Sequence, residues 1–249
     1  MTDAGDLDLS FGLDTMFPEP PRPPTPPPTI STYTRRNGQE IRIRLVGTHP
    51  LWGHYLWNSA RCLGDYLDDT VEVKGKTILE LGAGGALPSI IAGMNGAKKV
   101  VVTDYPDREL VENMSWNLRE AGLDIDVHRV VEVMGYIWGS DVKPLRDQVT
   151  EGFDIIILSD LIFNHSQHDA LLKTCELAGK DGVEVLVFYT HHRPHLAHRD
   201  MGFFEKAKQR GWGCEMVVER RYEPMFPNDP GAEDVRGTVY GWSLTRSRR

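Results

Sequence analysis

A buried run that leads into a glycine-rich turn and then a helical pattern constrains the fold of this 249-residue chain more than any other feature. Ile78, Leu79 and Leu81 are typical of a short buried strand. The small residues at 82–86 indicate a tight turn, and from Leu87 the apolar residues recur at helical spacing. Such a turn presents free backbone N–H groups beside the positive end of a helix dipole. The segment therefore predicts an α/β fold with a site for a nucleotide-like ligand.

The class of ligand is indicated by what this turn lacks. The dinucleotide fingerprint G-x-G-x-x-G needs a third glycine for close packing of the helix. Gly82 and Gly84 fill the first two places, but the third falls on Leu87. Glu80 precedes the glycines, and its carboxylate would repel a pyrophosphate but accept a hydrogen bond from a neutral or cationic ligand. An oxidoreductase with a nicotinamide cofactor, or a glycine turn with no ligand, remains an alternative that the pattern disfavours.

The rest of the chain predicts a doubly wound, mostly parallel seven-stranded sheet. Unbroken apolar runs at 100–102, 155–158 and 185–188 are expected of parallel strands covered on both faces. Helical patterns alternate with the strands, as in doubly wound α/β proteins. Beyond the first strand we expect strands at 99–104, 126–133, 153–159, 183–190, 214–221 and 238–244, and helices at 107–121, 166–178 and 203–210.

We divide the chain into a leader at 1–30 and one domain at 31–249. Within the domain, residues 31–75 are an N-terminal extension and residues 76–249 are the core. The leader is acidic and rich in proline, which predicts disorder. Its apolar residues also allow a segment that docks on a partner or over the site. Asn37-Gly38 predicts a two-residue hairpin turn, and apolar residues after Pro50 predict an amphipathic helix. Trp57 falls off the apolar side of that helix, so we place it at the mouth of the ligand site.

Candidate site residues follow the ends of three predicted strands. Asp104 ends the second strand, where a carboxylate reaches the ribose hydroxyls of an adenosine ligand. Trp138, just past the third strand, offers an aromatic plane for the adenine. The segment Ser159-Asp160-Leu161-Ile162-Phe163 follows the fourth strand, whose carboxyl end faces the same crevice. A random acid at a strand end and a tryptophan that seals the core are the alternatives for Asp104 and Trp138.

These motifs resemble a known family. The run E-L-G-A-G-G resembles the first motif of the seven-strand, Rossmann-like class I methyltransferases, which bind S-adenosyl-L-methionine. The run S-D-x-x-F resembles the D-x-x-[YF] motif of the enzymes that methylate protein lysines and amino groups. From about residue 31 onward the chain is similar to the fungal protein N-terminal and lysine methyltransferases that modify translation elongation factor 1-alpha. The resemblance implies a protein substrate and these cofactor contacts: Trp57, Gly82, Ala83, Gly84, Asp104, Trp138 and Ser159. Glu80 joins them as a predicted cofactor contact because of its place before the glycines.

The implied reaction needs a neutral amine. An α-amino group with a pKa of about 7.7–8.0 is partly neutral near pH 7, whereas a lysine at about 10.4 must first lose its proton. We hypothesise that Asp160 accepts a hydrogen bond from the incoming ammonium, while Phe163 and Tyr136 wall its channel. Phe163 departs from the tyrosine of many relatives, which removes a hydroxyl from this position.

Composition limits the other functions. A net charge of −8 argues against a general nucleic-acid binder. No apolar run approaches the roughly 20 residues that span a bilayer. Three scattered cysteines predict reduced thiols in the cytosol or nucleus, and we take the protein to be cytoplasmic. The histidines at 191–198 lack spaced partners, so we expect no metal site. Arg193 and Pro194 suit a surface loop, and a place at the substrate opening is the alternative for these histidines. We take the protein to act as a monomer.

Two further functions stay open. The same cofactor could serve methylation of RNA or a small metabolite, although N-P-P-[YF], expected for amino groups of bases, is absent after the fourth strand. Alternatively, the chain is a non-catalytic module that uses the fold as a scaffold. Glu80, Asp104 and Asp160 argue against that module, because a scaffold does not need these carboxylates.

Overall fold

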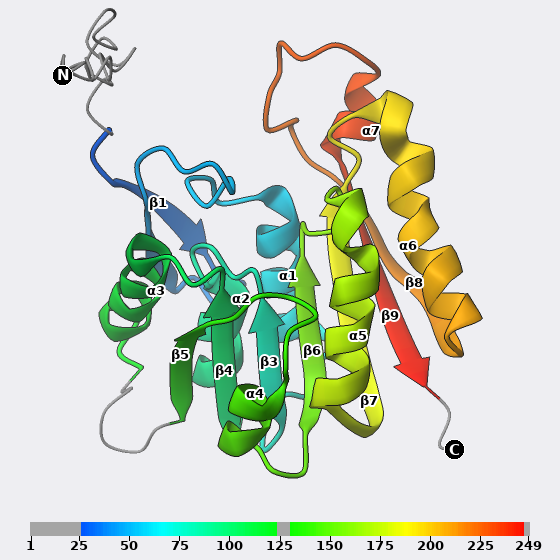
Figure 1. Cartoon of the computed structure of the whole chain (residues 1–249). Coiled ribbons are helices and arrows are strands. Elements are labelled where there is room, and N and C mark those ends of the chain that lie inside the picture. Colours follow the sequence, from blue (N-terminus) through cyan, green and yellow to red (C-terminus); the bar gives the residue numbers. More distant parts are fainter. Residues whose placement is uncertain (1–25, 124–129, 247–249) are drawn as a thin grey trace, which may run out of the picture.

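The computed structural model describes residues 26–123 and 130–246, which form a seven-stranded sheet between two layers of helices (Figure 1). The order across the sheet is β5-β4-β3-β6-β7-β9-β8. Neighbouring strands from β5 to β7 pair in parallel, and β9 pairs antiparallel with both β7 and β8. The predicted mostly parallel, doubly wound sheet is confirmed. Its strands are β3 (Thr77–Leu81), β4 (Lys99–Asp104), β5 (Val131–Gly135), β6 (Phe153–Ser159), β7 (Gly179–Thr190), β8 (Trp212–Arg221) and β9 (Thr238–Arg246).

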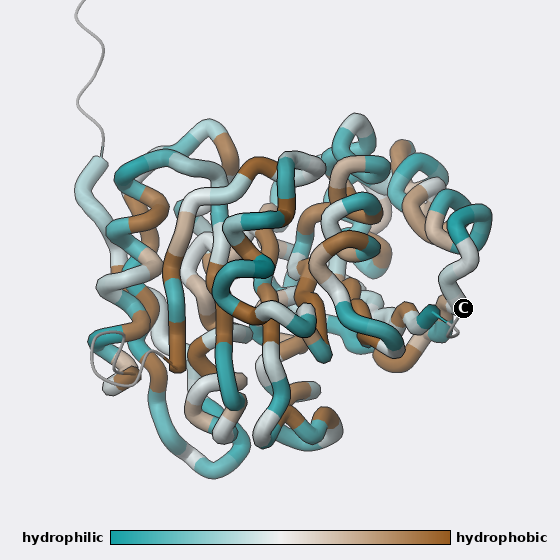
Figure 2. The backbone as a smooth tube through the Cα atoms, turned by 60° about the horizontal axis from the view of Figure 1, so that its bottom comes forward, coloured by the Kyte–Doolittle hydropathy of each residue, from teal (hydrophilic) through white to brown (hydrophobic). Residues whose placement is uncertain are grey.

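The two faces of the sheet bury two separate apolar clusters, because successive side chains of a strand point to opposite faces. Ile78 belongs to the cluster under the first three helices, and its neighbour Leu79 belongs to the cluster under the next three. The helices of the first face are α1 (Asn58–Asp69), α2 (Leu87–Met94) and α3 (Arg108–Glu120). The second face carries α4 (Lys143–Gln148), α5 (His168–Ala178) and α6 (Ala197–Gln209). In Figure 2 the outer helices alternate between hydrophobic and hydrophilic residues, as expected for helices with one buried side.

A hairpin of β1 (Thr29–Thr34) and β2 (Glu40–Leu45) forms its own two-stranded sheet. The side chain of Asn117, on α3, joins this hairpin to the glycine turn. Its amide nitrogen donates to the carbonyl oxygens of Arg44 (2.8 Å) and Gly85 (3.1 Å), and its oxygen accepts from the Arg44 N–H (2.7 Å). The predicted N-terminal extension therefore packs against the core next to the predicted ligand site.

Several local predictions were wrong. The helix expected after Pro50 begins only at Asn58, because Trp52 adopts a left-handed φ of 63° and residues 52–57 pack as a loop. The hairpin turn comprises residues 35–39 rather than two residues, and the hairpin starts at Thr29, inside the expected leader. The third strand lies at Val131–Gly135 instead of 126–133, of which 126–129 are outside the described residues. Sequence reasoning also missed α4.

The late part of the chain adds a loop, at 223–231, and short helical turns. The short turns are η2 (His165–Gln167), η3 (Pro194–Leu196) and α7 (Glu233–Gly237). Helix α6 begins six residues before the predicted helix at 203–210, since Pro194 can start a helical turn instead of interrupting one. Within the described residues, no helix is both long and apolar enough to cross a membrane.

Candidate functional site

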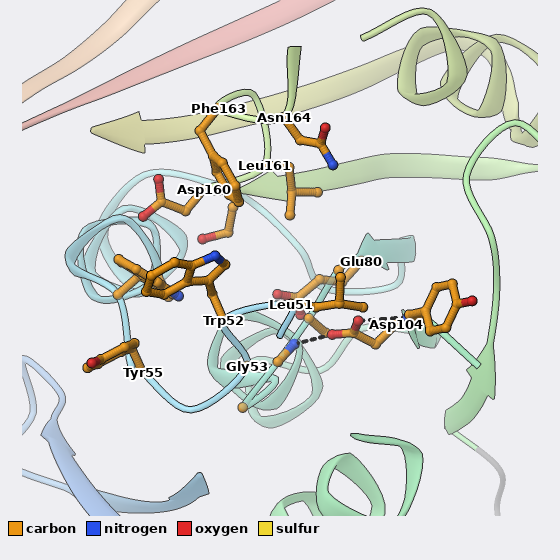
Figure 3. Close-up of a pocket in the computed structure, with 18 of the residues that line it drawn as sticks. Leu51, Trp52, Gly53, Tyr55, Glu80, Asp104, Asp160, Leu161, Phe163 and Asn164 are labelled. Carbon is orange, nitrogen blue, oxygen red and sulfur yellow. Dashed lines mark hydrogen bonds between the residues drawn. The ribbon is translucent and has the colours of Figure 1, made fainter. Parts of the chain in front are cut away.

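The candidate site is a cavity of about 570 Å³ at the carboxyl ends of β3, β4 and β6 (Figure 3). The chain leaves β3 toward β4 on one side and returns to β6 on the other, so β3 and β6 flank the topological switch point of the sheet. Ligands of doubly wound folds bind at this point. The ten residues that the sequence predicts for cofactor binding and catalysis all border this one cavity: Trp57, Glu80, Gly82, Ala83, Gly84, Asp104, Trp138, Ser159, Asp160 and Phe163.

The glycine turn brings the backbone to the edge of the cavity. Gly82 and Gly84 have φ values of +62° and +53°, which residues other than glycine rarely adopt. A Cβ at Gly82 would lie 2.6 Å from Leu161 Cδ2, whereas a Cβ at Gly84 would meet no atom within 4 Å. Gly82 is therefore required by packing and backbone conformation, and Gly84 by backbone conformation alone.

Asp104 is held in place by the turn that it faces. Its Oδ2 accepts the Gly84 N–H at 2.7 Å and its Oδ1 accepts the Tyr105 N–H at 2.7 Å; dashed lines in Figure 3 mark such bonds. Burial raises the pKa of the Asp104 carboxyl, although the two N–H donors oppose that rise. Further donors, such as ribose hydroxyls, would favour the charged form of this carboxyl.

Glu80 is fully buried under the turn. Its Oε2 accepts hydrogen bonds from the backbone N–H of Ser89 (3.0 Å) and from the Ser89 hydroxyl. Burial raises the pKa of Glu80 to about 8, and the Ser89 donors only partly offset it. Within the described part of the chain, Glu80 Oε1 and the Ser159 hydroxyl have no hydrogen-bond partner. Both residues border the cavity, and unpaired buried polar atoms at its edge fit a polar ligand that supplies the missing hydrogen bonds.

Asp160 follows β6 in a left-handed conformation with a φ of 59°, and only 5% of it is exposed. Its backbone N–H donates to the Phe188 carbonyl of β7 at 2.7 Å, which fixes its place at the end of the sheet. Both carboxylate oxygens lie 3.0 Å from His192 Nε2. Burial lowers the pKa of His192, but the neighbouring Asp160 carboxylate more than compensates and raises it above the ordinary value.

Aromatic rings form the wall near Asp160. Trp57 lies 5.3 Å from Tyr55, 6.0 Å from Phe226 and 4.9 Å from His192, measured between ring centroids. Phe226 belongs to the loop at 223–231, so this loop packs against Tyr55 and Trp57, two of the residues that border the cavity. In the view of Figure 3, Asp160, Phe163 and Trp52 lie toward one end of the cavity and Asp104 toward the other.

Tyr136 also borders the cavity, but its hydroxyl donates to the Ser140 carbonyl at 3.1 Å. Tyr136 is 6% exposed, and its bonded hydroxyl is committed to the chain itself. Tyr136 can therefore present only its ring to the cavity, which is consistent with the channel wall that we predicted for it.

Exposed apolar side chains surround the mouth of the cavity. Four large residues that border it are 46–50% exposed: Leu51, Trp52, Tyr105 and Ile137. Large apolar side chains exposed around one cavity can contact a binding partner. We call these four residues the apolar rim.

Sequence reasoning missed His192 as the partner of Asp160, Phe226 as part of the aromatic wall, and the apolar rim. The cluster His191-His192 directly after a predicted strand was the available signal for His192. No local signal pointed to Phe226, because it reaches Trp57 from a distant part of the sequence.

The other histidines near this end of the sheet form a separate buried cluster. The Asp200 carboxylate accepts hydrogen bonds from His165 Nε2 at 2.6 Å and from His191 Nδ1 at 2.7 Å. Across residues 26–123 and 130–246, no group of three His, Cys, Asp or Glu side chains is arranged to hold a metal ion.

The residues present fit S-adenosylmethionine. The glycine turn offers backbone close to the cavity, Asp104 offers a carboxylate for hydroxyl donors, and the unpaired Glu80 Oε1 offers an acceptor for an ammonium group. An aromatic ring, Trp138, borders the same cavity. Hydroxyls, an ammonium group and a flat base are the polar and aromatic parts of this cofactor.

The comparisons with known proteins agree with this geometry. A family described as "Lysine methyltransferase" matches residues 36–210, which is more than half of the chain. The protein N-terminal and lysine N-methyltransferase of Schizosaccharomyces pombe is 46% identical over 248 residues, covering 94% of this chain and 95% of that protein. The protein of the same name from Cryptococcus neoformans var. neoformans is 44% identical over 269 residues, covering 96% and 89%.

Solved structures share the fold at low sequence identity. The O-methyltransferase from Bacillus cereus, in complex with SAH, has a TM-score of 0.55 at 15% identity and covers 79% of this chain and 84% of that one. A Streptococcus mutans structure assigned as a SAM-dependent methyltransferase has a TM-score of 0.60 at 14% identity and covers 90% of this chain, but this chain spans only 56% of its length. These structures support the fold alone.

Proposed function

This chain belongs to the lysine methyltransferase family, and on that premise we propose that it methylates the N-terminal glycine and the adjacent lysine of translation elongation factor 1-alpha. The cofactor is S-adenosylmethionine. The observation that carries the proposal is the position of Asp160, a buried carboxylate at the aromatic end of the cavity that the glycine turn also borders. Two relatives named for N-terminal and lysine methylation support the choice of amine acceptors.

The chain's main task is to orient its two reactants. When bound, the cofactor supplies a methyl group that is already activated on a sulfonium. Asp104 would hold its ribose, and Glu80 and Ser159 would accept or donate hydrogen bonds at its polar end. Trp57 and Trp138 would exclude water from the cavity, which keeps the reacting groups aligned.

Asp160 is suited to receive the substrate amine. A carboxylate that is 5% exposed attracts an ammonium group strongly, because water screens the charge only weakly. Phe163 and Trp57 border the same cavity, and aromatic faces attract cations. The site thus draws the amine in as a cation, after which the amine must lose a proton to attack.

The charges around the cavity favour a protein over RNA. Among the described residues that line it, two carboxylates, Asp104 and Asp160, outnumber one cationic side chain, Arg193. Glu80 also lines the cavity but stays protonated near pH 7, because burial raises its pKa to about 8. RNA carries a phosphate for each nucleotide and needs cations along its path. The apolar rim instead offers contacts to the side chains of a peptide that brings its amine into the cavity.

We further propose that the enzyme acts as a monomer in the cytoplasm. The residues predicted to bind the cofactor and the amine all come from one chain and border one cavity. The cytoplasm is where a translation factor would meet its modifying enzyme. Light scattering of the purified protein tests the first proposal, and imaging of a tagged chain in fungal cells tests the second.

The activity is tested with labelled S-adenosylmethionine and purified elongation factor 1-alpha. We expect label on the α-amino group of the N-terminal glycine and on the next lysine, located by mass spectrometry. An N-terminally acetylated factor is the matched control and should lose the first label. Label that enters RNA, or no transfer by a protein that binds the cofactor, would contradict the proposal.

Asp160→Asn tests the role of the carboxylate. Asparagine tolerates the left-handed backbone that Asp160 adopts, so the fold should be retained. We expect kcat to fall by roughly 100-fold or more, as for the loss of an acid–base group, with cofactor affinity unchanged. Unchanged turnover would remove Asp160 from the mechanism.

A further inference from the structure

The pairing of His192 with Asp160 goes beyond what the family motifs contain. His192 lies just after β7, and Asp160 lies just after β6, so the parallel pairing of these strands brings the two residues together. The contact is symmetrical, because His192 Nε2 lies 3.0 Å from each carboxylate oxygen. The side chains are 17% and 4% exposed, so the pair is largely shielded from water.

The surroundings of His192 leave it few other partners. Trp57 packs against its ring at 4.9 Å between centroids. Its charged neighbours are Asp160, Asp200 on α6 and Arg193 on the next position of the chain. Asp200 is already bonded to His165 and His191, and Arg193 borders the exposed mouth of the cavity. Asp160 is therefore the charged group that contacts His192 directly and is not already paired with another histidine.

We propose that His192 is a positioning residue that acts through Asp160: it fixes the carboxylate toward the substrate amine and takes up the proton that the amine releases before methyl transfer. The inference rests on the proposed function. The ammonium proton passes to an Asp160 oxygen and then to His192 Nε2, which leaves a neutral amine, an ionised Asp160 and an imidazolium. The amine goes from +1 to 0 and the pair from −1 to 0, so charge and protons balance.

The transfer needs the neutral His192 tautomer that carries its proton on Nδ1, because only then can Nε2 accept the proton from Asp160. When His192 is neutral and its proton is on Nδ1, the Nε2 lone pair faces two carboxylate oxygens, which is unfavourable. A proton between Nε2 and the carboxylate removes that repulsion. The raised pKa of His192 has the same cause and agrees with this arrangement.

The test uses three variants of the full chain. His192→Gln can place its amide nitrogen near Asp160 and donate a hydrogen bond, but it cannot accept a proton. His192→Leu removes both abilities. His198→Asn changes an exposed histidine on α6 and is the matched control. For each variant we would measure cofactor affinity by calorimetry. We would also measure kcat and KM from pH 6 to 9.5 with a substrate peptide that begins with the N-terminal glycine and adjacent lysine of elongation factor 1-alpha.

We expect His192→Gln to bind the cofactor normally and to lose roughly tenfold to 100-fold in kcat near pH 7. The deficit should shrink toward pH 9.5, because an α-amino group with a pKa of about 8 then loses its proton to solvent. His192→Leu should show the same deficit and a higher KM, and His198→Asn should match the wild type.

Two results would overturn the proposal. Wild-type kcat in His192→Gln would exclude proton uptake, and a deficit that does not change with pH would indicate a purely structural role. Failure of the proposed function looks different, because the wild type itself would then bind the cofactor but transfer no methyl group to the peptide.

Discussion

The buried carboxyl group of Glu80 makes the stability of the cofactor-free protein depend on pH. Glu80→Gln should remove this contribution, because glutamine does not ionise. Glu80 is fully buried, and its pKa in the folded protein is about 8, against 4.5 for an ordinary glutamate. Below pH 4.5 both the folded and unfolded forms are protonated, so the group has no effect. Between pH 4.5 and 8 the unfolded form ionises and the folded form does not, so stability falls as pH rises.

The size of this effect follows from the two pKa values. Each pH unit between them costs about 1.4 kcal/mol, so Glu80 lowers the free energy of unfolding by about 5 kcal/mol at pH 8 and above. Glutamine cannot ionise, and its oxygen can still accept from Ser89. Its buried amide nitrogen lacks a partner, which costs about 1–3 kcal/mol. Glu80→Gln should therefore be more stable than the wild type by about 2–4 kcal/mol at pH 8.5 and less stable near pH 5.

The assay is urea unfolding of both proteins without cofactor at several pH values from 5 to 9. The difference between the two curves isolates Glu80, because every other titrating group is common to both proteins. We expect the difference to change sign between about pH 5 and 7. Parallel curves, or a variant that is less stable at every pH, would refute the buried, protonated carboxyl group.

Two more predictions concern the walls of the cavity. Gly82→Ala should cost about 2–5 kcal/mol of stability, since it combines a left-handed backbone with a clash. Gly84→Ala should cost only about 1–2 kcal/mol, because the added Cβ at Gly84 meets no other atom. Equal losses of stability in thermal unfolding would contradict this distinction. Phe226→Ala should raise KM for the substrate peptide up to roughly tenfold, because it removes ring contacts to Trp57 and Tyr55. A change in cofactor affinity alone would contradict a role of the 223–231 loop in binding the peptide.

The sheet could be predicted because its signals are local. Apolar runs such as 155–158 mark buried parallel strands wherever they occur, and the glycine turn after β3 fixes which end of the sheet carries the site. Residues directly after parallel strands meet at that end, so Asp104 and Asp160 could be placed beside the glycine turn without any coordinates.

Local periodicity failed where packing across the chain decides the backbone. Trp52 and Tyr55 recur at helical spacing, yet they lie in a loop because their rings pack on Phe226, a residue of the distant loop at 223–231. The helix could begin only at Asn58, after these contacts end. Spacing reports which side of an element is apolar, but it does not report what that side will meet.

The amino-acid sequence by itself determined the α/β sheet, the glycine turn and the acidic residues at its edge, because each depends on neighbours within a few positions. Only the tertiary structure decided that His192 pairs with Asp160, 32 positions earlier in the chain. It also decided that Glu80 lies under the turn with a free carboxylate oxygen. Burial and distance set the charge of these groups, and both arise only when the strands and loops have come together.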